Sequence, residues 1–250
     1  MSQSTYLSTA IAAAREAGNL QRTHFGGELG VNSFEKHDIK LVLDVESQEL
    51  ITKHLLAAFP DHALYGEEGI AGNQSSEFQW IVDPIDGTVN YFYGIPHFCI
   101  SIALRQGKDI LAGVIYDPMR EEMWTVERGG QPQLNGQPIR VSPRSQLSDA
   151  ILSVGLSKTR ASIDAGMPLL ETMVRRARKC RLMGSAALDM AYIACGRLDA
   201  YIEQAISLWD VAAGILLIES AGGKVVMTPH PEVPDKFSIV ASNGLLDLNV

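Results

Sequence analysis

A segment spanning residues 66–92, "GEEGIAGNQSSEFQWIVDPIDGTVNYF", contains the residue types from which a metal site is built. Asp83 and Asp86 come directly after the apolar run "WIV" and are separated by Pro84 and Ile85. Proline lacks an amide donor and favours an extended conformation at the preceding residue. Alternation along a strand then lets the Ile85 carbonyl face the same point as the Asp83 carboxylate. These oxygen atoms suit a divalent cation.

The residues that follow Asp86 suit an anion instead. Gly87 permits a sharp turn, and the helix after it would begin with a free amide at Thr88. Helix N-termini bind anions because their first amides have no partner within the helix. The segment therefore predicts a phosphate next to a metal ion. A simple turn explains an isolated DxxDG pattern equally well, so the interpretation depends on other acidic residues.

Acidic residues elsewhere in the chain favour the metal interpretation. Glu67 and Glu68 follow the short predicted strand "HALYG", and no lysine or arginine occurs in the range 61–86. Asp210 falls in the first turn of a predicted helix, where its spacing from Ser207 also fits a capping box. Ligand sets made only of oxygen favour Mg²⁺, Mn²⁺ or Ca²⁺ over zinc.

Composition limits the classes of partner. The 250 residues are 46% apolar and 20% charged, as expected for a globular protein with a core. The net charge of −8, with a pI near 5.2, argues against nucleic acid or an anionic membrane as a partner. We expect the N-terminal residues to form an amphipathic helix and not a secretory signal, and no apolar run reaches the roughly 20 residues of a membrane span. Cys99, Cys180 and Cys195 fit neither a zinc motif nor a disulfide framework, so we expect reduced core thiols in a cytoplasmic protein.

Apolar periodicity divides the chain into two halves, which we expect to pack as one compact unit around a joint site. In the α+β half, residues 1–145, we predict an opening helix that ends near Gly26, a helix over 45–59 and an antiparallel meander over 78–141. The α/β half, residues 146–250, alternates between the two kinds of element. Its predicted helices span 166–180, 185–196 and 209–223, and its predicted strands span 150–156, 198–203, 224–228 and 237–243.

Three segments carry a resemblance to a known family. "GEEG" at 66–69, "WIVDPIDGTVNYFYGIPHF" at 80–98 and "WDVAAGILLIESAGG" at 209–223 occur in the order found in the inositol monophosphatase family of Mg²⁺-dependent, lithium-sensitive phosphatases. The resemblance extends over nearly the whole chain. It implies an α+β fold, the layered α-β-α-β-α sandwich of the sugar phosphatases, and a homodimer that binds a small phosphate-ester substrate.

The resemblance also implies roles for individual residues. The metal ligands would be Glu67, Asp83, the Ile85 carbonyl, Asp86 and Asp210, which together hold two or three Mg²⁺ ions. Catalytic groups around the attacking water would be Glu67, Thr88 and Asp44. Substrate contacts would come from Asp86, Gly87, Thr88, Gly184, Ser185, Ala186 and Glu203.

The implied reaction is metal-assisted hydrolysis of a phosphate monoester by water, with myo-inositol monophosphate as the first candidate. Ser207 replaces a histidine that many animal members carry near the sugar, which leaves fructose 1,6-bisphosphate, histidinol phosphate and a nucleotide 3′-phosphate as alternatives. Asn90 disfavours the nucleotide branch, which tends to be acidic at this position. A non-catalytic regulatory protein on the same scaffold is the third alternative, and the complete set of carboxylates argues against it. We predict that the aromatic stretch 91–104 supplies dimer surface.

Overall fold

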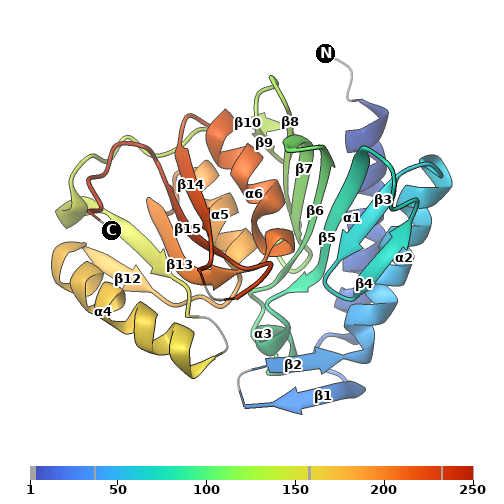
Figure 1. Cartoon of the computed structure of the whole chain (residues 1–250), viewed down its shortest axis with the longest axis horizontal. Helices are drawn as coiled ribbons and strands as arrows, with labels where there is room; N and C mark the ends of the chain where they lie inside the picture. The colour runs from blue at the N-terminus through green and yellow to red at the C-terminus, as the bar shows by residue number, and fades with distance from the viewer. Residues whose placement is uncertain (1–3, 37, 157–158, 232, 250) are drawn as a thin grey trace.

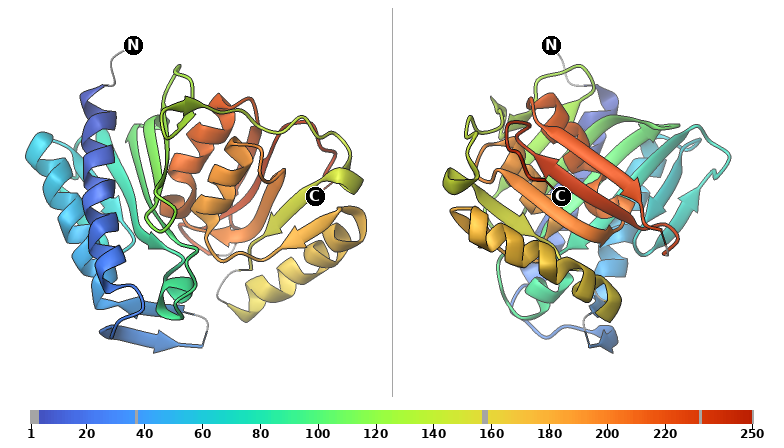
Figure 2. Two further views of the ribbon diagram at one scale, coloured as in Figure 1. Left: turned by 180° about the vertical axis from the view of Figure 1, so that it is seen from behind. Right: turned by 60° about the vertical axis from the view of Figure 1, so that its left-hand side comes forward.

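A computed structural model describes residues 4–36, 38–156, 159–231 and 233–249. Helices α1 (Thr5–His24) and α2 (Val42–Ala58) pack against one face of an eight-stranded sheet. Helices α5 (Ala186–Ala194) and α6 (Leu208–Ser220) lie between that sheet and a five-stranded sheet, and α4 (Arg160–Arg176) packs on the five-stranded sheet from outside (Figures 1 and 2). The molecule is therefore an α-β-α-β-α sandwich, which confirms the predicted fold class.

The eight-stranded sheet contains the predicted meander. Its strands are β3 (Ala63–Gly66), β4 (Gly69–Gly72), β5 (Phe78–Asp86), β6 (Cys99–Gln106), β7 (Asp109–Asp117), β8 (Glu122–Glu127), β9 (Gln133–Leu134) and β10 (Gln137–Pro138). They are ordered β10-β9-β8-β7-β6-β5-β3-β4, and every neighbouring pair is antiparallel except β3 and β5. The parallel pairing places the ends of β3 and β5, and thus their acidic residues, at the same edge.

The five-stranded sheet has the order β12-β11-β13-β15-β14. Its strands are β11 (Ile151–Val154), β12 (Lys179–Arg181), β13 (Ala200–Ile206), β14 (Lys224–Pro229) and β15 (Phe237–Ser242). Strand β11 runs parallel to both neighbours, whereas β15 is antiparallel to β13 and β14. A short 3₁₀ helix, Leu147–Asp149, precedes β11.

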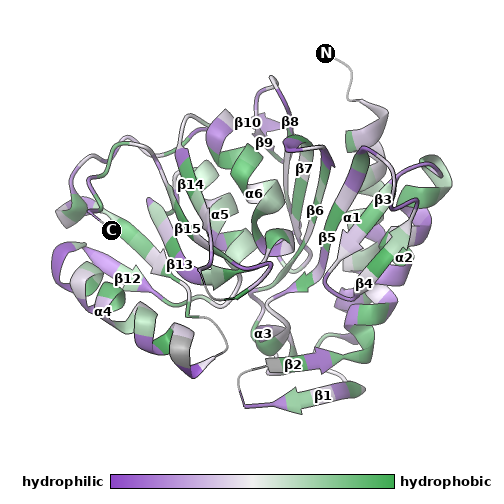
Figure 3. Cartoon of the chain, viewed as in Figure 1, coloured by the Kyte–Doolittle hydropathy of each residue, from purple (hydrophilic) through white to green (hydrophobic). Residues whose placement is uncertain are grey.

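The two central helices form the core between the sheets. Almost all of α5 and most of α6 are buried, and Figure 3 colours much of both helices as hydrophobic, whereas α4 is mixed. A helix covered on both sides must be apolar around most of its circumference. Small residues bring the layers close together, since a Cβ at Gly113 would lie 3.1 Å from the Ala213 carbonyl oxygen of α6.

Several predicted boundaries were wrong. The helix predicted over 166–180 begins earlier, at Arg160, where the Thr159 side chain caps the Ser162 amide, and it ends at Arg176. Residues 179–181 instead form β12, because they pair with the buried strand β11. The hairpin of β1 (Val31–Glu35) and β2 (Asp38–Leu41) was not predicted, nor was β4.

The stretch predicted to supply dimer surface is mostly core. Residues 99–104 are buried because they lie in β6, which has strands on both sides and helices on both faces, and Phe98 is buried against Ile85 and Tyr91. Tyr93 and Ile95 remain exposed, at 63% and 49%. The cysteines form no disulfide, and only Cys99 is fully buried. Within the described residues, no helix combines the length and apolar character needed to cross a bilayer.

Candidate active site

The DPIDGT segment forms the irregular end of β5. The register of β5 against β6 shifts between Asp83 and Asp86, as expected where Pro84 has no amide to donate. The buried Gln21 of α1 fixes this stretch by donating from Nε2 to the Pro84 carbonyl oxygen at 2.8 Å. The result is a pair of inward-facing carboxylates, with Asp83 1% exposed and Asp86 8% exposed.

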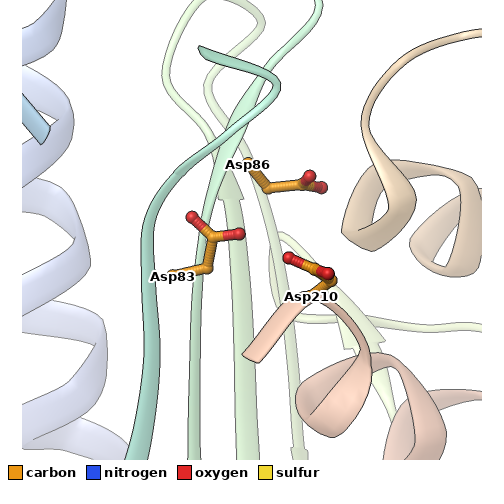
Figure 4. A group of neighbouring side chains, drawn as sticks. All are labelled: Asp83, Asp86 and Asp210. Carbon is orange, nitrogen blue, oxygen red and sulfur yellow. The ribbon is translucent and has the colours of Figure 1, made fainter. Parts of the chain in front are cut away.

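Asp210 joins this pair from α6. Figure 4 shows the carboxylates of Asp83 and Asp86 on one side, facing Asp210 at the beginning of α6. Each of the three offers one oxygen, and these oxygens all lie within 4.8 Å of one another. Asp210 Oδ2 also accepts a hydrogen bond from the Ser207 amide at 3.0 Å. Asp210 therefore caps α6 and faces the cluster at the same time.

The three aspartates destabilise one another's ionised forms. Burial raises the pKa of Asp83 well above its usual value, and the charges of Glu67, Asp86 and Asp210 raise it further. Burial and then Asp210 raise the pKa of Asp86 to about 7, against hydrogen bonds from Ser185 and the Ala187 amide. Buried carboxylates with this mutual repulsion fit a hard divalent cation, which would neutralise them.

Glu67 and Glu68 form the turn between β3 and β4 and have different surroundings. Glu67 lines the same cavity as the aspartates and contributes to the raised pKa of Asp83. Glu68 pairs with Lys40 at 3.1 Å, and its amide donates to Gln48 Oε1 at 2.9 Å. Of the two acidic residues expected at this strand end, Glu67 therefore lies close to the aspartates, whereas Glu68 is paired with Lys40.

Gly87 and Asn90 shape the loop after the aspartates. Gly87 has φ of 101°, and a Cβ there would lie 3.1 Å from the carbonyl oxygens of Gly184 and His97. Helix α3 (Thr88–Phe92) begins directly after it. Asn90 Nδ2 donates to His97 O at 2.8 Å and to Met183 O at 2.9 Å. Asn90 thus ties α3 to the segment that precedes α5.

Thr88 and Asp44 meet as the resemblance implied, although Thr88 has a closer partner. The Thr88 hydroxyl lies 2.9 Å from the Ile85 carbonyl oxygen and 3.4 Å from Asp44 Oδ1. Asp44 lies in the first turn of α2 and accepts the Leu41 amide at 2.7 Å. Burial raises the Asp44 pKa to about 7, and the Glu68 charge adds to the rise.

The segment before α5 surrounds Asp86. The Ser185 hydroxyl donates to Asp86 Oδ2 at 2.7 Å, and the Ala187 amide donates to the same oxygen at 2.6 Å. Gly184 adopts φ of 80°, which favours glycine. The Ser185 hydroxyl therefore donates its hydrogen bond to Asp86. Gly184, Ser185 and Ala186 all line the cavity.

The cavity has a volume of about 590 Å³ and brings all the predicted residues together except Asp44. Glu203, on β13, lines the end formed by the five-stranded sheet and accepts a hydrogen bond from the Tyr201 hydroxyl. Gly155 leaves the space for Glu203, because a Cβ there would overlap Glu203 Oε2.

Within the described part of the chain, sequence reasoning missed four polar residues that line this cavity: Lys40, Asp189, Tyr201 and Lys236. Asp189 is 2% exposed and accepts a hydrogen bond from the Ser153 hydroxyl at 2.6 Å. A carboxylate in the first turn of the predicted α5 gave a weak signal for Asp189. Lys236 belongs to no motif, and only the pairing of β13 with β15 places it at the cavity.

Comparisons with known proteins agree with this geometry. The sequence model of the inositol monophosphatase family matches residues 2–248. A relative from Xylella fastidiosa named Nus factor SuhB is 41% identical, covering 86% of this chain and 79% of the relative. An inositol-1-monophosphatase from Mesorhizobium japonicum is 37% identical, covering 98% of this chain and 94% of the relative.

Solved structures extend the similarity to the whole fold. The extragenic suppressor protein suhB from Bartonella henselae is 33% identical with a TM-score of 0.89, covering 97% of this chain and 95% of that chain. An inositol monophosphatase from Anabaena is 35% identical with a TM-score of 0.84, covering 96% and 91%. The chain belongs to the inositol monophosphatase family.

Proposed function

We propose that this protein is a Mg²⁺-dependent phosphatase that hydrolyses a small phosphate monoester, with myo-inositol monophosphate as the first candidate substrate. The supporting observation is the set of Asp83, Asp86 and Asp210, whose carboxylate oxygens lie within 4.8 Å of one another in a cavity next to Gly87 and Thr88. Membership of the family gives the reaction class.

The chain would hold two or three Mg²⁺ ions through Glu67, Asp83, the Ile85 carbonyl, Asp86 and Asp210. When bound, Mg²⁺ supplies Lewis acidity and lowers the pKa of a coordinated water. The free amides at the start of α3, at Gly87 and Thr88, would orient the phosphate.

Proton handling would fall to Thr88 and Asp44. The Thr88 hydroxyl is close enough to transfer its hydrogen bond between the Ile85 carbonyl, at 2.9 Å, and Asp44 Oδ1, at 3.4 Å. The Thr88 hydroxyl would accept a proton from the attacking water and pass its own proton to an ionised Asp44. Such positioned proton transfer typically contributes about 10²–10⁴-fold.

Substrate hydroxyls would be bound at the opposite end of the cavity. Glu203 is a buried acceptor there, and Gly184 and Ala186 border the same space. Charge-assisted hydrogen bonds to a carboxylate discriminate strongly between ligands with and without the matching donor.

Phosphate release from a panel of small esters tests the proposal. The panel contains inositol 1-phosphate, fructose 1,6-bisphosphate, histidinol phosphate and a nucleotide 3′-phosphate, each assayed with Mg²⁺ and with excess EDTA. Turnover that requires Mg²⁺ and falls by orders of magnitude in Asp210→Asn supports the proposal. Full turnover in EDTA contradicts the metal assignment.

A regulatory role is the second candidate, and the names of several relatives favour it. Relatives from Xylella fastidiosa and Pseudomonas aeruginosa are named Nus factor SuhB, a factor and not an enzyme by name. If the ester panel gives no turnover while Mg²⁺ still binds, the regulatory role becomes the better account.

We also propose a homodimer as the minimal unit, in line with the resemblance. The exposed side chains of Tyr93 and Ile95, just after α3, support an association surface close to the cavity. Their placement after α3 would couple association to the loop that carries Gly87.

A further inference from the structure

Among the residues that the structure describes, two lysines line the acidic cavity, and their surroundings differ. Lys40 already pairs with Glu68, at 3.1 Å. Lys236 pairs with no carboxylate among the described residues: its Nζ donates to the Ser207 hydroxyl and lies 5.8 Å from the centre of the Trp209 ring. An ammonium group that faces an acidic cavity without a carboxylate partner is available to an anionic ligand.

The fold places Lys236 beside the beginning of α6, on the side of the cavity formed by the five-stranded sheet. Lys236 directly precedes β15, whose first residue, Phe237, pairs with Ile206 at the end of β13. Glu203 lies on the same strand β13 and also lines the cavity. The substrate phosphate, which we propose is held by the amides of Gly87 and Thr88, would instead lie next to β5, in the other sheet. If the phosphate lies next to β5, the leaving group of the substrate would extend towards the side of the cavity lined by Glu203 and Lys236.

The partners of Lys236 stabilise its charge only in part. Lys236 is partly buried, so its ammonium has lost some of its hydration. A hydroxyl is neutral, and a cation–π contact at a partly exposed position contributes only about 0.5–1 kcal/mol. An anionic group on the ligand would complete the set of partners and form a charge-assisted hydrogen bond.

We propose that Lys236 binds a second anionic group of the substrate, on the side of the leaving group. This inference rests on the proposed phosphatase activity and defines its substrate class: small phosphate monoesters that also carry a carboxylate or a second phosphate. Glu203 accepts hydrogen bonds from hydroxyls at this end, and Lys236 supplies the complementary positive charge.

Matched pairs of esters test the proposal. The first pair is 2-phosphoglycerate and glycerol 2-phosphate, which differ only in a carboxylate that replaces a hydroxymethyl group. The second pair is fructose 1,6-bisphosphate and fructose 1-phosphate, which differ in a second phosphate. Values of kcat and KM are measured for wild type, Lys236→Met and the control Lys224→Met. Lys224 is an exposed lysine at the start of β14, the neighbouring strand of the same sheet.

In the wild type, kcat/KM should be about ten-fold or more higher for the member of at least one pair that carries the additional carboxylate or phosphate, the size expected for a hydrogen bond between charged groups. Lys236→Met should remove this preference mainly through KM and affect the member with a single phosphate and no carboxylate far less. Lys224→Met should retain the preference. The pair that responds identifies the anion as a carboxylate or a phosphate.

Two outcomes overturn the proposal. The first is a wild type without preference in either pair. The second is a Lys236→Met variant that loses the same factor on both members of a pair, which assigns Lys236 to supporting Ser207 at the start of α6. If no ester is hydrolysed at all, the proposed function fails separately. Calorimetric titration of 2-phosphoglycerate and glycerol 2-phosphate into Mg²⁺-loaded wild type and Lys236→Met then gives the Kd of each ester. The inference is overturned if wild type does not bind 2-phosphoglycerate more tightly, or if Lys236→Met weakens the binding of both esters by the same factor.

Discussion

Replacing Asp86 by asparagine should stabilise the metal-free protein and at the same time remove most of its activity. Asp86 is 8% exposed and lies opposite Asp210, and both burial and this neighbour disfavour its ionised form. Asparagine is nearly equal in size and keeps an oxygen that can accept from Ser185 and from the Ala187 amide. The substitution therefore removes a repulsive charge without removing packing.

The magnitude follows from the pKa of Asp86. Because the folded protein raises this pKa from 3.8 to about 7, the folded state binds the proton more tightly than the unfolded state. Stability therefore falls as pH rises from about 4 to about 7, and it stays low above that range. Each pKa unit corresponds to about 1.36 kcal/mol, so the ionised carboxylate destabilises by up to about 4 kcal/mol at pH 8. Weaker hydrogen bonds to the neutral amide reduce the net gain to about 2–4 kcal/mol.

Urea unfolding in EDTA measures this gain. Wild type and Asp86→Asn are compared at pH 8 and at pH 5, where the folded wild type is already protonated and the difference should shrink by half or more. Asp117→Asn is the matched control. Asp117 is also buried, but it accepts hydrogen bonds from the amides of Met119 and Arg120 and pairs with the Arg120 guanidinium at 2.8 Å. Loss of this charge should destabilise the protein by about 1–3 kcal/mol.

Mg²⁺ supplies the second half of the test. A saturating cation that binds only the folded state raises the free energy of unfolding by an amount that grows with the logarithm of its affinity. Wild type should therefore gain more stability from Mg²⁺ than Asp86→Asn does. The reasoning is refuted if Asp86→Asn destabilises the metal-free protein as strongly as Asp117→Asn does, because Asp86 would then be held by favourable contacts and not by repulsion.

Three further predictions concern the site and the assembly. Thr88→Val and Asp44→Asn should each lower kcat by about 10²–10⁴-fold, and the double variant should be little worse than either; multiplicative losses in kcat argue against a proton relay. Glu203→Gln should reduce discrimination among polyol phosphates by about ten-fold while affecting a hydroxyl-free aryl phosphate less, and equal losses on both esters would assign Glu203 a structural role. Light scattering should give about twice the 27.2 kDa of the chain, and a value equal to the chain mass excludes the dimer.

The sequence by itself indicated the chemistry of the site. Asp83, Ile85 and Asp86 lie within four residues, so strand geometry and the lack of an amide at Pro84 favour a group of oxygen atoms at one strand end, and Glu67 and Asp210 favoured a metal site over a simple turn. Long apolar runs likewise determined the meander and the central helices, because periodicity depends on local geometry. These features need no knowledge of contacts between distant segments.

Only the tertiary structure decided which distant residues join this cluster. The capping position of Asp210 is predictable from its own helix, but its approach to Asp86 depends on α6 lying between the two sheets. The part of the stretch 91–104 that forms β6 was wrongly assigned to the surface, since an apolar run has the same composition in a central strand and at an interface. Lys236 reaches the cavity through the register of β13 with β15. Strand pairing and layer packing bring together residues that have no relationship along the chain, and for this reason local patterns could not predict them.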